Sequence, residues 1–225
     1  MFWRGILCKF AKWSLTLIVS HKHRFIYFAV PRTATHSVRA ALGPHLGVDD
    51  WQQEGLASNK RLPVPELARA GHGHIGVRAL KPHLSSEQWE SYFKFGLVRH
   101  PYDRFVSVCA FLNRDNPDFE SRPLEWMLEA LVRPRFRQRM LVKPQTEMLV
   151  DETGSLALDF IGHYEQLNAS LNNVRLRTGL GELALTHQNK SPRNETSEYL
   201  DSALRKQLNE FYRKDFELLN YDMLS

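Results

Sequence analysis

Cysteine is scarce in this chain of 225 residues, which contains only Cys8 and Cys109. Two cysteines this far apart provide neither a disulfide framework nor the paired spacing of a zinc site. A reducing compartment is the simpler assumption, and we therefore expect a cytoplasmic protein.

Long apolar runs are missing as well. The longest uncharged part of the N-terminal segment, residues 13–20, is too short to span a bilayer. Before it, Arg4, Lys9 and Lys12 alternate with apolar and aromatic residues. This segment could contact a membrane surface peripherally, act as a weak signal, or dock on the domain as a terminal helix. We expect it, as residues 1–23, to lie outside the folded domain.

The excess of positive charge is small, because 30 Lys and Arg against 25 Asp and Glu give a formal net charge of +5. This balance suits an anionic ligand, but without a basic motif it does not indicate nucleic acid as a partner. Hydrophobic residues make up 43% of the chain, as in an ordinary globular protein. The length fits one α/β domain, which we place at residues 24–225.

The most informative stretch follows residue 24. Apolar, β-favouring residues 25–30 lead into a loop at 31–37 and then into a short helix, a pattern that predicts a strand, a tight loop and a helix N-terminus. The N–H groups of such a terminus, together with the Arg32 guanidinium, suit a phosphate or sulfate group. Ser and Thr are also common N-caps, so an ordinary capped junction is the alternative. The hydroxyl side chains of this loop are Thr33, Thr35 and Ser37.

Two histidines flank a glycine further along the chain. On an extended strand His72 and His74 would point the same way, because side chains alternate with a period of two. A histidine has a pKa near neutrality and can act as a general base. Metal ligation is the weaker alternative, because no third ligand stands at a recognisable zinc spacing.

A second strand is predicted at residues 93–98 and is followed by a helix that begins near Pro101. Arg99 stands where the strand ends, at the edge where open α/β sheets bind their ligands. Ion pairing of Arg99 and Arg104, for instance with Asp103, is the alternative role for these cations.

Four arginines at alternate positions form a basic run in residues 133–139. A solvated face is the default interpretation of such a run, and contact with an anionic acceptor is the alternative. Beyond it, the pattern predicts a hairpin or two short strands at 148–162, a helix at 164–177 and a last helix at 202–220.

Taken together, these motifs resemble the sulfotransferases that use 3′-phosphoadenosine 5′-phosphosulfate, PAPS. Residues 30–37 resemble the 5′-phosphosulfate loop of the carbohydrate group, which includes heparan sulfate uronyl 2-O-sulfotransferase and many small bacterial members. Residues 96–107 resemble the 3′-phosphate motif of that group, and residues 72–74 are similar to the HGH of the uronyl enzymes. The resemblance covers about residues 24–222.

This resemblance implies a P-loop-like fold, with a central parallel β-sheet flanked by helices. It also implies PAPS as co-substrate and no metal. The residues expected to hold the phosphosulfate are Arg32, Thr33, Ala34, Thr35, His36 and Ser37. Those expected to hold the 3′-phosphate are Arg99 and Ser107. Those expected to close over the cofactor are Asn189, Lys190 and Ser191.

The implied reaction is an in-line transfer of a sulfuryl group to the hydroxyl of an acceptor, which we expect to be a carbohydrate. His74 would be the general base, Arg32 would stabilise the leaving phosphate, and His72 would orient the acceptor or His74. Arg32 replaces the family's usual lysine, and a guanidinium binds oxyanions well but is a very poor proton donor. His36 replaces a residue that is usually small.

Two other functions compete with this interpretation. A small-molecule kinase would need the G-x-x-x-x-G-K-[ST] loop, whereas the loop at residues 31–37 has no glycine. A non-catalytic binder of PAP or anionic glycans would fit the composition and the arginine run equally well.

Overall fold

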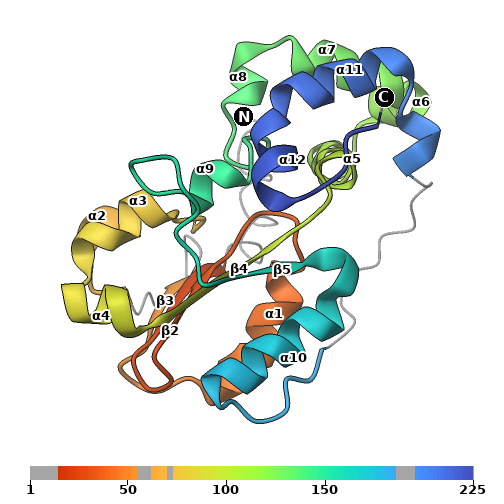
Figure 1. Ribbon diagram of the computed structural model, residues 1–225. Coiled ribbons are helices and arrows are strands. Elements are labelled where there is room, and N and C mark those ends of the chain that lie inside the picture. Colours follow the sequence, from red (N-terminus) through yellow and green to blue (C-terminus); the bar gives the residue numbers. More distant parts are fainter. Residues whose placement is uncertain (1–14, 55–61, 70–72, 186–195, 225) are drawn as a thin grey trace, which may run out of the picture.

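The computed structural model describes residues 15–54, 62–69, 73–185 and 196–224. Its centre is a five-stranded sheet in the order β3-β1-β2-β4-β5 (Figure 1). The strands are β1 (Leu15–Ser20), β2 (Phe25–Phe28), β3 (Trp51–Glu54), β4 (Phe93–Val98) and β5 (Phe160–His163). The predicted α/β fold is confirmed. The sheet is mixed, because β2, β4 and β5 run parallel while β1 is antiparallel to both of its neighbours.

The antiparallel strand comes from the segment that we expected outside the domain. Leu15–Ser20 pairs with β2 on one side and β3 on the other, and its residues Leu17, Ile18 and Val19 are buried. These residues therefore form an interior strand and not the terminal helix considered above. Residues 1–14, for which peripheral membrane contact was one of the possibilities, lie outside the described residues. Within the described ranges, no helix is both long and apolar enough to cross a bilayer.

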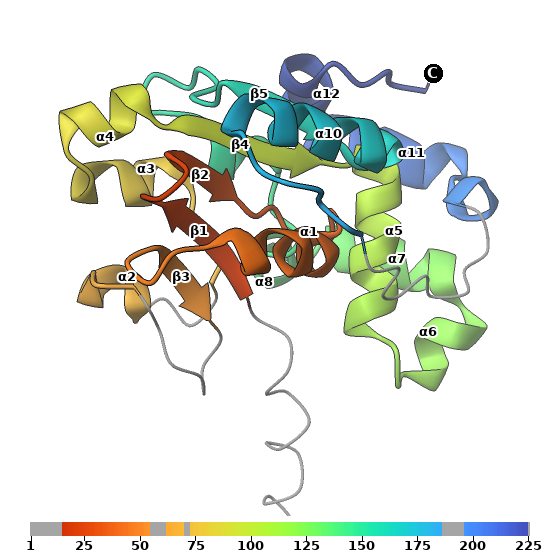
Figure 2. The same ribbon diagram turned by 90° about the horizontal axis from the view of Figure 1, so that it is seen from below.

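Helices cover both faces of the sheet (Figures 1 and 2). The reason lies in β2, whose side chains alternate between two apolar clusters, with Phe25 and Tyr27 in one and Ile26 and Phe28 in the other. The helices packed on the first face are α1 (Thr35–Leu42) and α10 (Leu167–Thr178). The helices on the second face include α2 (Pro65–Ala68), α3 (Val77–Leu80), α4 (Ser86–Ser91) and α9 (Thr146–Leu149).

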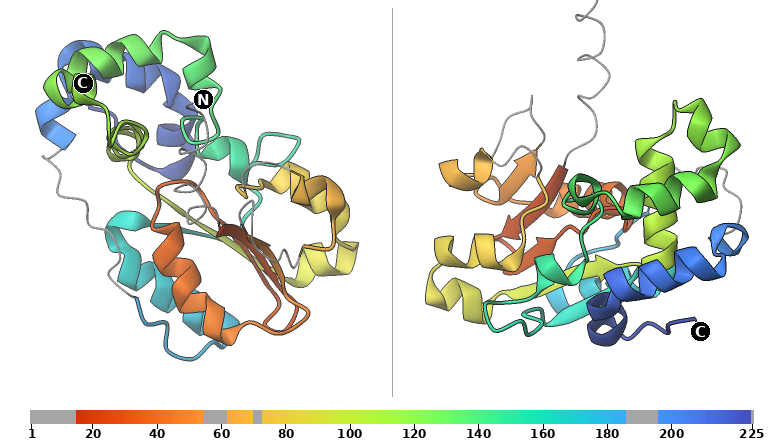
Figure 3. Two further views of the ribbon diagram at one scale, coloured as in Figure 1. Left: turned by 180° about the vertical axis from the view of Figure 1, so that it is seen from behind. Right: turned by 90° about the horizontal axis from the view of Figure 1, so that it is seen from above.

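A third apolar cluster lies beyond the C-terminal end of β4, within a group of helices that Figure 3 shows from two sides. These helices are α5 (Pro101–Leu112), α6 (Pro117–Ser121), α7 (Pro123–Leu131), α8 (Pro134–Arg137), α11 (Ser202–Phe211) and α12 (Arg213–Leu219). The predicted last helix is thus two helices that break at Tyr212. The buried Tyr212 hydroxyl donates to the Val142 carbonyl at 2.6 Å, and this long-range bond helps to fix the break.

Of the hairpin or two short strands predicted at 148–162, one strand forms, as β5. The first predicted strand is instead the end of α9 and a single bridge between Val150 and Leu156. Short 3-10 helices complete the described structure, and they are η1 (Gly43–His45), η2 (Lys81–His83), η3 (Tyr164–Gln166) and η4 (Thr196–Tyr199).

The register of β2 and β4 places their C-terminal ends side by side, with Phe28 opposite Gly96. A Cβ at Gly96 would lie 3.1 Å from the Phe28 carbonyl oxygen and 3.0 Å from a methyl carbon of Leu158. Glycine therefore allows this close packing. As a result, the loop after β2 and the loop after β4 are neighbours at one edge of the sheet.

Candidate active site

The loop after β2 is held in a strained shape from within. Arg32 and Ala34 have φ angles of 69° and 63°, which are left-handed values that cost a non-glycine residue about 1 kcal/mol each. The hydroxyls of Thr33 and Thr35 both donate to the Val30 carbonyl at 2.9 Å. These bonds close the loop on itself and help to maintain the strained angles.

This shape changes what the loop offers a ligand. Thr33, Thr35 and Ser37 are buried, whereas Arg32 and His36 are partly exposed. Two of the three hydroxyls predicted to line an anion site are thus already bonded within the loop. The side chains of the loop that stay partly exposed include the Arg32 guanidinium and the His36 imidazole.

Helix α1 begins without a side-chain cap. Its N-cap residue is Ala34, which makes no side-chain cap hydrogen bond, and the first turn contains no acidic residue. In contrast, Ser85 and Asp201 cap α4 and α11 with side-chain oxygens. The first N–H groups of any helix lack partners within that helix. The capped-junction alternative is therefore not what forms here, and the start of α1 suits an anion.

Arg99, at the end of β4, presents a second cationic group. Its guanidinium carbon lies 4.4 Å from the centre of the Tyr164 ring. Its Nε atom is buried and makes no hydrogen bond. In the described part of the chain Arg99 forms no ion pair, so the pairing with Asp103 considered above is absent there. A buried, unpaired N–H on a permanent cation is the feature that a bound phosphate would satisfy.

The two junctions touch through Arg32. Its Nε donates to the Ser107 hydroxyl at 3.0 Å, and its guanidinium carbon lies 4.7 Å from the centre of the Phe111 ring. Ser107 and Phe111 are one turn apart on α5, so this helix supports the side chain on one face. The cation expected at the phosphosulfate therefore contacts the hydroxyl expected at the 3′-phosphate, and Ser107 itself is fully buried.

His74 is tied to the strand that carries the loop. Its Nδ1 lies 2.8 Å from the carbonyl oxygen of Ala29, next to the end of β2. A carbonyl oxygen can only accept, so Nδ1 carries the hydrogen and the lone pair of the neutral ring is on Nε2. Gly73 and His74 adopt no regular structure, and the expected extended strand does not form in these two residues.

His36 is expected to make stability depend on pH. Burial, and then the charges of Arg39 and Arg32, lower the pKa of His36 below its ordinary value of 6.5. As the pH drops below about 6.5, His36 is therefore protonated more readily in the unfolded chain than in the folded one. The free energy of unfolding should fall in that range. His36→Gln should lose less stability between pH 7.5 and 5.5 in thermal unfolding. Because the side chain is only half-buried, screening keeps the difference below about 1 kcal/mol, and identical pH profiles would contradict this prediction.

Some predicted site residues lie outside the described residues. These are His72, Asn189, Lys190 and Ser191. Within the part that the structure describes, no group of three or more His, Cys, Asp or Glu side chains could hold a metal ion.

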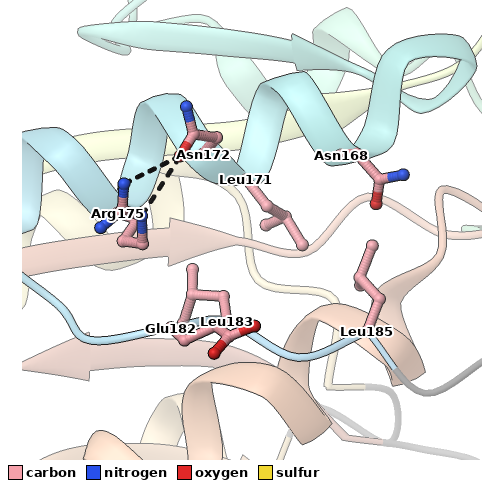
Figure 4. A pocket seen from close by; sticks show the side chains of 7 residues that line it. All are labelled: Asn168, Leu171, Asn172, Arg175, Glu182, Leu183 and Leu185. Carbon is pink, nitrogen blue, oxygen red and sulfur yellow. Dashed lines mark hydrogen bonds between the residues drawn. The ribbon is translucent and has the colours of Figure 1, made fainter.

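A small cavity of about 130 Å³ lies between α10 and the segment that follows it (Figure 4). Leucine side chains line part of it, and two of its polar residues, Arg175 and Asn172, bond each other. The lining residues are Asn168, Leu171, Asn172, Arg175, Glu182, Leu183 and Leu185. None of them belongs to the two junctions, so this cavity is separate from the candidate site.

Sequence reasoning missed several residues that shape the site. Tyr164 packs on Arg99, and Phe111 packs on Arg32. Arg104, for which surface ion pairing was an alternative, is buried and forms no ion pair among the described residues. Its place among the apolar residues of α5 was the only sequence signal that could have indicated that Arg104 is buried.

The uncapped helix α1 follows the parallel strand β2, and Arg99, with its unpaired Nε, follows the neighbouring strand β4. This arrangement suits an extended anionic ligand. The family to which this chain belongs is the sulfotransferase family, since the model of that family matches residues 15–222. Neither a curated protein nor a solved structure matches the chain. The family supports sulfuryl transfer as the general activity.

Proposed function

We propose that this protein transfers the sulfuryl group of PAPS to a hydroxyl of a carbohydrate acceptor. The observation that carries the proposal is the contact between Arg32 and Ser107, which joins two cationic junctions at one edge of the sheet. PAPS carries its 3′-phosphate and its 5′-phosphosulfate on the same ribose, so a ligand with two separate anionic groups suits two adjacent anion sites.

The residues present fit such a donor. The start of α1 and the Arg32 guanidinium would hold the phosphosulfate, and the buried Nε of Arg99 would gain a partner from the 3′-phosphate. PAPS supplies a sulfuryl group that is already activated by its bond to phosphate. The protein then has to position the acceptor and stabilise developing charge.

His74 is the candidate base. Its Nδ1–H donates to the Ala29 carbonyl, which helps to fix the ring orientation, and the lone pair that would accept a proton from the acceptor hydroxyl is on Nε2. Ala29 lies two residues before the loop at 31–37, and this supports a place for the imidazole near the proposed phosphosulfate position.

Arg32 would stabilise the charge that develops on the leaving phosphate. Its planar fork carries five N–H donors, and the Nε–H bond to Ser107 helps to fix the plane of that fork. Because a guanidinium does not release its proton near neutral pH, this residue would act by charge and hydrogen bonding alone.

An anionic carbohydrate is compatible with the exposed basic run on and around α8. Arg133 pairs with Glu129 at 2.8 Å, and the Arg137 guanidinium stacks 4.5 Å from the centre of the Phe211 ring. These contacts hold two of the cations at the surface, where an acidic acceptor could meet them. The four arginines, all exposed, are Arg133, Arg135, Arg137 and Arg139.

Sulfur-labelled PAPS offered with a panel of polysaccharides and small hydroxylated acceptors tests this function. We expect label to move to a polysaccharide and PAP to be released in equal amount. Turnover of ATP without use of PAPS would instead support a small-molecule kinase. PAP binding without transfer to any acceptor would support a non-catalytic binder.

A further inference from the structure

Gln145 holds the backbone of Arg99 from both sides. Its Oε1 accepts from the Arg99 N–H at 2.9 Å, and its Nε2 donates to the Arg99 carbonyl at 2.8 Å. Only an amide side chain offers a donor and an acceptor in this arrangement. Gln145 is fully buried, so water does not replace these bonds.

Asp215 of α12 fixes Gln145 in turn. Its Oδ2 accepts from the Gln145 backbone N–H at 2.9 Å, and its Oδ1 accepts from the Thr146 backbone N–H and hydroxyl at 2.9 and 2.8 Å. Asp215 is fully buried, so its carboxylate is a rigid acceptor for the segment that carries Gln145.

Arg104 ties the same segment to the loop after β2. It donates from Nε to the Pro31 carbonyl at 3.1 Å, from Nη1 to the Lys143 carbonyl at 3.1 Å and from Nη2 to the Leu141 carbonyl at 2.9 Å. Its charge also partly offsets that of Asp215. Both anion-binding junctions are therefore anchored to residues 141–146.

From these contacts we propose that Gln145 is a positioning residue for the 3′-phosphate site, held in place by Asp215. It touches the backbone of Arg99 and not the guanidinium, so it acts by setting the direction in which that long side chain leaves the strand. A small rotation of the Arg99 backbone would displace the guanidinium from a bound phosphate. This inference rests on the proposed function, because it assumes that Arg99 binds the 3′-phosphate of PAPS.

The chain offers a matched control in the next residue. Thr146 is buried and bonds Asp215 as Gln145 does, but no bond between it and Arg99 is found in the described structure. Calorimetry on the whole protein would compare PAP, which has a 3′-phosphate, with AMP, which lacks one. Gln145→Met should lower PAP affinity about tenfold and AMP affinity less than about twofold. Thr146→Val should lower the unfolding temperature but leave the ratio of the two affinities unchanged.

Gln145→Asn, which keeps the amide but shortens its reach, is measured beside Gln145→Met in case the longer variant does not fold. We expect Gln145→Asn to lower the ratio of PAP affinity to AMP affinity as Gln145→Met does. A ratio that stays constant in the Gln145 variants, or falls as far in Thr146→Val, would overturn the positioning role alone. If the unaltered protein has no affinity for PAP, the proposed function fails and this inference fails with it.

Discussion

Replacing His74 by asparagine should slow sulfuryl transfer by about 10²- to 10⁴-fold, the usual contribution of a general base. The Asn side chain can still donate to the Ala29 carbonyl, so the local backbone should keep its shape while the basic nitrogen is lost. PAP affinity should therefore stay within about threefold of that of the unaltered protein. Initial rates with labelled PAPS and calorimetry with PAP measure the two effects separately.

A second histidine provides the control. The ring of His23 also bonds a backbone carbonyl, that of His45, at 3.0 Å, but it lies in the turn between β1 and β2. His23→Asn should leave the transfer rate unchanged. Equal losses of rate and PAP affinity in His74→Asn would argue against its role as the base.

Replacing Arg99 by methionine should weaken PAP binding by about 100-fold, since it removes a cation whose buried Nε–H has no partner of its own. Methionine keeps much of the side-chain length that packs over Tyr164. AMP, which lacks the 3′-phosphate, should lose less than about threefold. Titration calorimetry with the two nucleotides checks both numbers.

Arg135→Met removes the same charge from an exposed position and should change neither affinity. If Arg99→Met binds PAP as well as the unaltered protein does, the second anion site is elsewhere. Equal losses of PAP and AMP affinity would mean that Arg99 supports the whole site and does not bind the 3′-phosphate specifically.

Local patterns in the sequence predicted the strands that carry the site and the helices that follow them. They failed where pairing is long-range. The short apolar stretch Leu15–Ser20 follows interspersed cations and gives no sign of the two strands that enclose it. Similarly, no glycine or proline marks the break at Tyr212, where a contact with Val142 holds the chain.

In the candidate site too, the sequence predicted local features but not long-range contacts. Arg32 was expected in the loop after its strand and Arg99 directly after its strand, and both lie in these places. The inward turn of Thr33 and Thr35 was not foreseen, because left-handed angles at Arg32 and Ala34 have no signature in non-glycine residues. Gln145 is 46 residues from Arg99 in the chain, so only the folded structure reveals that they are bonded.

The position of β2 has a consequence for how long the site keeps its shape. This strand is the middle one of five, so both of its edges are bonded to other strands. Fraying is easiest at edges and termini and hardest at the centre of a sheet, where it approaches global unfolding. The strain of the loop that follows β2 therefore cannot relax by loosening the strand beneath it, and we expect the loop to keep its left-handed angles whether or not a ligand is bound.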